Sequence, residues 1–218
     1  PTIQAAVDVA SAYDMDLGAD GTYTGPGDRD IDLGGKQIIV KSENGPENCI
    51  IDCEGTELEP HRAFIFENDE TPESILDGFT IINGMARQYG GAVFCKGTSP
   101  TILNCNFAQC ATFGSGYGGG AVYTTGNAAP RIEKCTFTNN TTHSLGGAIY
   151  AMVSSPTIYN CTFTQNTAEL HGGAIACQFS NAKISHCRIT RNTAQGGAGV
   201  FIWFFAKPTI DRVLTTRN

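Results

Sequence analysis

The stretch Ser155-Pro156-Thr157-Ile158-Tyr159-Asn160-Cys161 returns along the chain with the same order of residue types. Its counterparts are 99–105 (SPTILNC), 129–135 (APRIEKC) and 181–187 (NAKISHC), and a fifth copy opens at 207–210 (KPTI). The cysteines that close the four full copies are 30, 26 and 26 residues apart. A near-constant period of this length is typical of stacked units, each too small to bury an apolar face alone.

Within one unit, apolar and polar residues alternate over short runs that turn residues separate, which is the pattern of strands. Stacked units then place like residues in apolar columns. The columns are Ile102, Ile132, Ile158, Ile184 and Ile210; Phe107, Phe137, Phe163 and Ile189; and Val93, Val122, Ile149, Ile175 and Val200. Three columns indicate three strands per turn. We therefore expect an all-β, single-stranded right-handed parallel β-helix with about 26 residues per turn.

Asparagine also recurs with this period, at Asn140, Asn166, Asn192 and Asn218. An Asn amide at the end of a strand can hydrogen-bond the turns above and below it. We expect these residues to form a structural ladder rather than a substrate-binding site.

The chain has nine cysteines, and Cys105, Cys135, Cys161 and Cys187 occupy one column. Cys53 belongs to the same column if residues 51–53 (IDC) align with 76–78 (LDG) and 103–105 (LNC). Neighbouring parallel strands are about 4.8 Å apart, so a disulfide is allowed by distance. Their Cβ bonds point the same way, however, which is poor disulfide geometry. We expect buried free thiols, and one cysteine per turn cannot supply the four ligands of a zinc site.

The N-terminal residues differ from the repeats. Apolar residues in 2–12 recur with a helical period, and Thr2 precedes them as an N-cap. The expected organisation is a cap over 1–30, with this short helix and a first strand, followed by a parallel β-helix over 31–218 that continues in the natural protein. The cap would cover an open end of the coil, which is otherwise prone to pair with other chains.

Composition limits the partners. With 21 acidic and 14 basic residues the formal net charge is -7, which disfavours nucleic-acid binding. No apolar run reaches the 18 or so residues of a membrane span.

Candidate functional residues are few. The acids concentrated over 54–73 are expected to form a solvated loop face, with a calcium site as the alternative. His143, His171 and Glu169 are either surface residues or metal ligands. Arg188, Arg191 and Arg212 project from successive turns, as either a glycan-binding stripe or a solvated edge. Phe201, Trp203 and Phe205 share one side of a single strand, which is either a contact patch or is covered by a following segment or a neighbouring subunit.

Two sets of motifs carry a family resemblance. The Gly-Gly-Ala-Ile runs at 146–149 and 172–175 and the Phe-x-x-Asn runs at 137–140 and 163–166 resemble the GGAI and FxxN motifs of polymorphic outer-membrane proteins. The N-terminal runs 2–6 (TIQAA) and 20–23 (DGTY) look like those of pectate-lyase-like extracellular β-helix proteins. These families include adhesins, surface proteins and polysaccharide-degrading enzymes, so the resemblance implies the fold and leaves the activity open.

From the resemblance we expect a bacterial-type secreted or cell-surface scaffold that acts in adhesion or interaction without catalytic activity. The alternative is a polysaccharide lyase or glycoside hydrolase whose catalytic groups lie in loops or outside this sequence, and no catalytic residue is assigned. No cofactor is expected apart from the calcium alternative. The expected partners are a polysaccharide or a cell-surface molecule, together with self-association through the C-terminal end.

Overall fold

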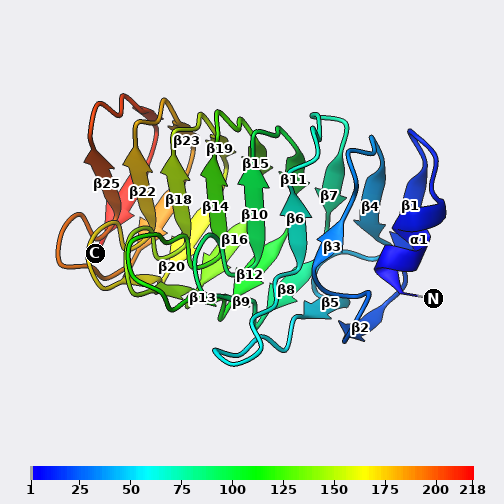
Figure 1. Ribbon diagram of the computed structural model, residues 1–218. Helices are drawn as coiled ribbons and strands as arrows, with labels where there is room; N and C mark the ends of the chain where they lie inside the picture. The colour runs from blue at the N-terminus through cyan, green and yellow to red at the C-terminus, as the bar shows by residue number, and fades with distance from the viewer. Residues whose placement is uncertain (1) are drawn as a thin grey trace.

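The computed structural model describes residues 2–218, which form an elongated solenoid with its two termini at opposite ends (Figure 1). Every strand pairing is parallel and joins one turn to the next. The expected right-handed parallel β-helix with three main strands per turn is confirmed, and a short fourth sheet accompanies the three long ones.

Sheet A contains β1 (Met15–Gly18), β4 (Ile39–Ser42), β7 (Ile75–Asp77), β11 (Thr101–Leu103), β15 (Arg131–Glu133), β19 (Thr157–Tyr159), β23 (Lys183–Ser185) and β26 (Thr209–Asp211). Sheet B contains β2 (Gly21–Thr24), β5 (Cys49–Asp52), β8 (Thr80–Ile82), β12 (Asn106–Ala108), β16 (Thr136–Thr138), β20 (Thr162–Thr164), β24 (Arg188–Thr190) and β27 (Leu214–Thr216).

Sheet C contains β3 (Ile31–Asp32), β6 (Phe64–Phe66), β10 (Val93–Lys96), β14 (Val122–Thr125), β18 (Ile149–Met152), β22 (Ile175–Gln178) and β25 (Val200–Trp203). The short sheet D contains β9 (Met85–Ala86), β13 (Ala111–Thr112), β17 (Thr141–Thr142) and β21 (Thr167–Ala168). The sequence pattern predicts a loop over 167–171, but its first two residues pair with the turns on either side.

The interior consists of like side chains stacked in register. Ile132 pairs with Ile158, and Ile158 pairs with Ile184, all at zero exposure. The rings of Phe137 and Phe163 stack with centroids 4.8 Å apart and planes 4° apart. Because each turn buries branched and aromatic groups against the same groups above and below, apolar burial is the main stabilising contribution.

The corner between sheets A and B is a single left-handed residue in each repeat. The backbone φ angle at this position lies between 48° and 56° in Asn104, Lys134, Asn160, His186 and Arg212. One such residue reverses the inward and outward alternation, so the cysteine that follows it points into the core. Asn is well suited to this conformation, which costs other side chains more.

The Gly-Gly pairs allow close approach of successive turns. Gly146 has φ of +69°, and a Cβ on Gly147 would collide with the carbonyl oxygen of Gly173 in the next turn. Both positions of the pair therefore require glycine.

Asparagine side chains join the turns at the end of sheet B. Asn140 donates its side-chain Nδ2–H and its backbone N–H to Oδ1 of Asn166, both at 3.0 Å. Asn166 makes the same two bonds to Asn192 at 2.9 Å, and Asn192 makes them to Asn218. Each buried amide is therefore satisfied by the ladder itself, as buried polar groups require.

All nine cysteines are buried and free. Cys105, Cys135, Cys161 and Cys187 follow one another before the strands of sheet B, and each thiol lies within hydrogen-bond distance of backbone carbonyl oxygen. The placement of Cys53 in this column is wrong. Ile50 pairs with Thr80 and Thr80 with Asn106, so the residue in line with Cys105 is Cys49.

The N-terminal turn is covered by α1 (Ile3–Val9), whose first turn is capped by the Thr2 side chain. Ile3 and Val7 are buried in the interior cluster, and the Ile3 backbone N–H donates to Asp28 Oδ1 at 2.8 Å. The helix lies beside β1 at the N-terminal end (Figure 1). Strands β1 and β2 pair with β4 and β5, so the first turn of the solenoid begins within the segment 1–30.

We expect Asn166→Ala to lower the free energy of unfolding by about 1–3 kcal/mol, because it leaves buried partners of the ladder without a hydrogen bond. Urea denaturation followed by circular dichroism measures the loss. The matched control is Asn160→Gly at an exposed left-handed corner, which should change stability by less than about 0.5 kcal/mol. Equal effects of the two substitutions would contradict a stabilising ladder.

The buried thiols predict loss of stability at alkaline pH. Burial raises the pKa of Cys110 and Cys177 to about 12, from an ordinary value of 9.0. Above pH 9 the unfolded chain therefore releases these protons first, and unfolding becomes easier by about 1.4 kcal/mol per thiol and pH unit. Urea titrations under reducing conditions between pH 7 and 10.5 should show a plateau and then a fall. Cys110→Ala should reduce its slope, and a pH-independent stability would refute the assignment.

Candidate functional site

The outer face of sheet C carries a column of mostly aromatic side chains. In register from the N-terminal side this column is Phe94, Tyr123, Tyr150, Ala176 and Phe201. These residues alternate with the interior valines and isoleucines of the same strands, so they project away from the core. We call the surface formed by this column and the side chains packed on it the aromatic face.

Two tyrosines from loops complete a cluster of rings at the N-terminal end of this face. The Tyr89 ring lies 4.6 Å from the Tyr117 ring and 4.9 Å from the Tyr123 ring, measured between centroids. Phe94 lies 5.8 Å from Tyr89, and Tyr150 lies edge-on to Tyr123 at 5.4 Å. Both loop tyrosines come just before glycine-rich turns, which bring them over the strands.

The rings surround a groove of about 280 Å³, which we call the aromatic groove. Its lining is Tyr89, Phe94, Lys96, Tyr117, Tyr123, Thr125 and Met152. Tyr89, Phe94 and Tyr117 are half-buried, whereas Tyr123 and Tyr150 are buried. Burial raises the pKa of the Tyr123 and Tyr150 hydroxyls, so both remain protonated donors at neutral pH.

Arg62 fixes the loop that carries Tyr89. Its guanidinium donates to the carbonyl oxygens of Gln88 and Gly90 at 2.8 Å and of Tyr89 at 3.1 Å. The same group lies 5.8 Å from the centre of the Phe94 ring, within range of a cation–π contact. Burial lowers the pKa of this guanidinium, but arginine remains charged at any physiological pH.

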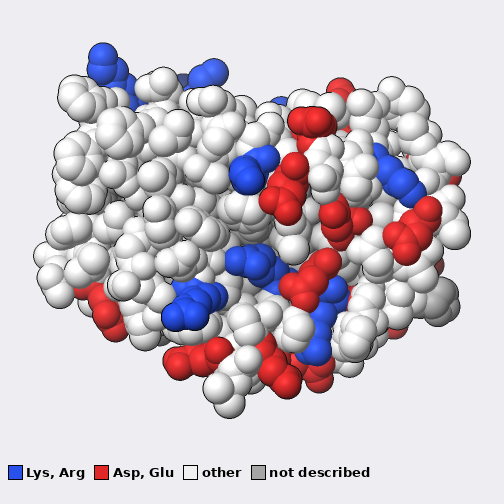
Figure 2. Space-filling view, viewed as in Figure 1, with Lys and Arg blue, Asp and Glu red and all other residues white. Residues whose placement is uncertain are grey.

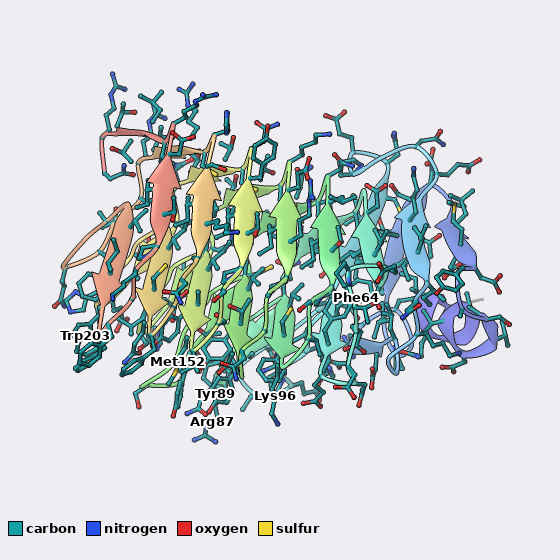
Figure 3. The ribbon with its side chains drawn as sticks, turned by 90° about the horizontal axis from the view of Figure 1, so that it is seen from above. Phe64, Arg87, Tyr89, Lys96, Met152 and Trp203 are labelled. Atoms are coloured by element: carbon teal, nitrogen blue, oxygen red, sulfur yellow. The ribbon has the colours of Figure 1, made fainter. Side chains whose placement is uncertain are left out.

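The aromatic face is almost free of charge beyond the groove. The strands β14, β18, β22 and β25 contain no Lys, Arg, Asp or Glu. Figure 2 shows this as a white surface over these strands, whereas acidic and basic side chains crowd the N-terminal turns. Four labelled side chains project from the same side of the solenoid, namely Tyr89, Lys96, Met152 and Trp203 (Figure 3). Phe64 lies inside it.

The expected contact patch lies at the C-terminal end of the same face. Trp203 is 43% exposed and Phe205 is 84% exposed, whereas Phe201 is half-buried and stacks on His171 with centroids 4.3 Å apart. Phe179 and Phe204, which the sequence pattern did not single out, stack 5.7 Å apart beside them. Both have left-handed backbones, at φ of 49° and 38°, a conformation that is costly for bulky residues.

The three arginines expected to form one stripe are divided by the structure. Arg188 and Arg191 line a groove on the outer face of sheet B, and Arg217 lines it with them. Arg212 occupies the corner between sheets A and B, where it contacts His186 and Asp211.

The acidic residues of 54–73 do not converge. Glu54 pairs with Arg29 at 2.9 Å, and the buried Glu70 accepts the backbone N–H groups of Gly35 and Asn68. Within residues 2–218, no three His, Cys, Asp or Glu side chains are grouped in a geometry that could hold a metal ion.

The histidines have local partners. His143 lies 3.6 Å from Glu169, while the His171 ring stacks on Phe201. His61 accompanies Asp30 at 2.6 Å, a pairing that the sequence pattern did not suggest. In the described part of the chain, no hydroxyl or thiol hydrogen-bonds to His61, so the pair lacks the nucleophile of a catalytic triad.

Comparison with protein families matches residues 38–212 to the family described as right-handed beta helix region. The match covers most of the chain, so the chain belongs to this family of right-handed β-helix proteins. Comparisons with curated proteins and with solved structures found no match. Among residues 2–218, no helix has the length and hydropathy needed to cross a membrane. The family defines the architecture and leaves the activity open.

We expect Arg62→Gln to loosen the loop under Tyr89, because the carbonyl oxygens that the guanidinium binds lose their donors. Hydrogen exchange read by mass spectrometry should show faster exchange in peptides covering 86–92, with a loss of overall stability of about 1–3 kcal/mol. Arg87→Gln is the matched control because Arg87 is exposed and nearby. Unchanged exchange in the Arg62 variant would show that this loop is held by other contacts.

Proposed function

We propose that the protein is a non-catalytic interaction module that holds a polysaccharide on its aromatic face, outside the cell or at the cell surface. The aromatic groove carries the proposal. It combines half-buried rings with hydroxyl and ammonium groups in a space of about 280 Å³. This volume is at the lower limit of small-ligand sites and suits one sugar ring.

The chemistry of the groove matches that of a sugar. A sugar ring has apolar C–H faces and a rim of hydroxyl groups. Phe94 and the tyrosine rings offer apolar surface for the faces, and the tyrosine hydroxyls, Thr125 and Lys96 offer hydrogen-bonding groups for the rim.

The uncharged surface beyond the groove favours an extended and neutral ligand. Adjacent parallel strands are about 4.8 Å apart, so the four strands from β14 to β25 extend the surface by about 14 Å. Further sugar units could lie there without burying an unpaired charge, which would be costly. Met152 and Trp203 lie on this course (Figure 3).

The absence of catalysis is proposed from the lining of the groove. Its residues include no Asp, Glu or His, whereas glycoside hydrolysis generally uses a pair of carboxyl groups flanking the scissile bond. The extracellular or cell-surface setting is proposed from the resemblance to adhesins and surface β-helix proteins.

A double substitution of Tyr89 and Tyr117 to Ala tests the proposal. We expect affinity for the bound polysaccharide to fall about tenfold or more, because two half-buried aromatic rings of the groove are lost. Affinity electrophoresis of the unmodified protein in gels containing separate neutral polysaccharides (a glucan, a xylan and a mannan) first identifies the ligand. The same gels then compare the variant.

Tyr159→Ala provides the matched control, because Tyr159 is a half-buried tyrosine on the outer face of sheet A. Equal retardation of the double variant and the unmodified protein would reject the aromatic groove as the site. No retardation in any gel would reject a neutral polysaccharide ligand. Release of shorter fragments, detected by chromatography after prolonged incubation, would replace the non-catalytic function with a lyase or hydrolase activity.

A further inference from the structure

A second groove crosses the outer face of sheet B near its C-terminal end, and we call it the arginine groove. Its volume is about 580 Å³, and its lining is Thr164, Arg188, Thr190, Arg191, Thr216 and Arg217. Arg188 projects outward from β24 and pairs in register with Leu214. Arg191 and Arg217 follow the last residues of β24 and β27, so they lie one turn apart.

In the described part of the chain, the three guanidiniums of this groove have no acidic partner. Elsewhere, Arg29 pairs with Glu54, and Arg131 pairs with Glu133. Within residues 2–218, no carboxylate lies within ion-pair distance of Arg188, Arg191 or Arg217. All three are exposed, and the groove is lined only by arginine and threonine. Like charges on neighbouring turns repel each other, so the grouping of these arginines does not stabilise the fold.

The distribution of charge along the chain strengthens this local field. Residues 1–133 contain 19 acidic and 7 basic residues, whereas residues 134–218 contain 2 acidic and 7 basic residues. The C-terminal turns are therefore positive in a protein whose net charge is -7. A positive groove with few nearby acids attracts anions and raises their rate of encounter.

We propose that the arginine groove binds an acidic polysaccharide through its sulfate or carboxylate groups. A guanidinium presents paired N–H donors that match the oxygens of these groups, and repeated arginines match a polymer with repeated anions. Thr164, Thr190 and Thr216 form a column along the same surface and add hydroxyl donors. A nucleic acid fits less well because no aromatic side chain lines the groove to stack on bases.

Arg212 supplies an internal comparison. It lies on the adjacent corner with the same formal charge, but it contacts Asp211 and His186 instead of the groove. Replacing it changes the net charge as replacing Arg188 does, so the two substitutions separate a defined site from general attraction. The groove is on a different sheet from the aromatic face and is tested independently of the neutral ligand proposed there.

The test titrates the protein with heparin as a sulfated probe and polygalacturonate as a carboxylated probe, using isothermal calorimetry at two salt concentrations. We expect Arg188→Gln combined with Arg191→Gln to weaken binding to at least one probe about tenfold or more, and Arg217→Gln to weaken it less. Arg212→Gln should remain within about twofold of the unmodified protein. The probe that binds distinguishes sulfate from carboxylate recognition, and circular dichroism confirms that each variant is folded.

Four results would overturn the proposal. One is no binding of either probe, and another is equal weakening by the groove substitutions and by Arg212→Gln. A third is equally tight and equally arginine-dependent binding of a single-stranded oligonucleotide, which would assign the groove to nucleic acid. The fourth is salt-sensitive self-association in analytical ultracentrifugation that the Arg188 and Arg191 substitutions abolish while binding of the probes is unchanged. That result would assign the arginine groove to contact with the acidic turns of a second copy.

Discussion

Like side chains stacked upon like, one turn above the next, are the constraint from which the rest of this structure follows. The isoleucine, phenylalanine and asparagine columns all need the same register, because a shift of one residue would turn each inward side chain outward. The parallel pairing of neighbouring turns keeps that register at every sheet. The Asn ladder adds a polar constraint that an apolar stack lacks, since each amide has one partner position in the next turn.

The same alternation separates stability from recognition. Each strand of sheet C places one set of side chains in the main core and the other on the opposite face, where Tyr123, Tyr150 and Ala176 pack with Leu145 in a second cluster. In β14 the interior Val122 continues an aliphatic column, while its neighbour Tyr123 belongs to the aromatic face. In β24 the interior Ile189 lies next to Arg188, which faces the arginine groove. Two chemically different surfaces are thus built on one repeated core without changing it.

The architecture could be predicted from the sequence because its cause is periodic. Ile158 predicts the position of Ile184 one period later, and Asn166 predicts Asn192 in the same way. The prediction for Cys53 failed where the period is broken, since the early turns differ in length and shift Cys49 into the column. The family match supports the same fold over residues 38–212 and adds no activity.

The candidate surfaces could not be read from the period in the same way. Tyr89 and Tyr117 meet because two loops of different turns fold over one face, each just before a glycine-rich turn. Arg212 and Arg217 each follow the last residue of a strand. The geometry of the corners places Arg217 in the arginine groove and Arg212 against His186 outside it. The sequence does show a tyrosine just before each of two Gly-Gly pairs. That the two tyrosine rings lie together follows only from the three-dimensional packing of the loops.

Because the register is uniform, the distance along the solenoid axis between two residues in the same column takes only fixed values. Two surface features on the same sheet are separated by a whole number of turns, each about 4.8 Å in rise. A duplication or loss of one 26-residue unit would therefore move every later residue by one step while preserving the direction in which it points. Gain or loss of whole turns could thereby match the distance between two binding groups to the spacing of the repeating units in a polymer. No individual contact would have to change.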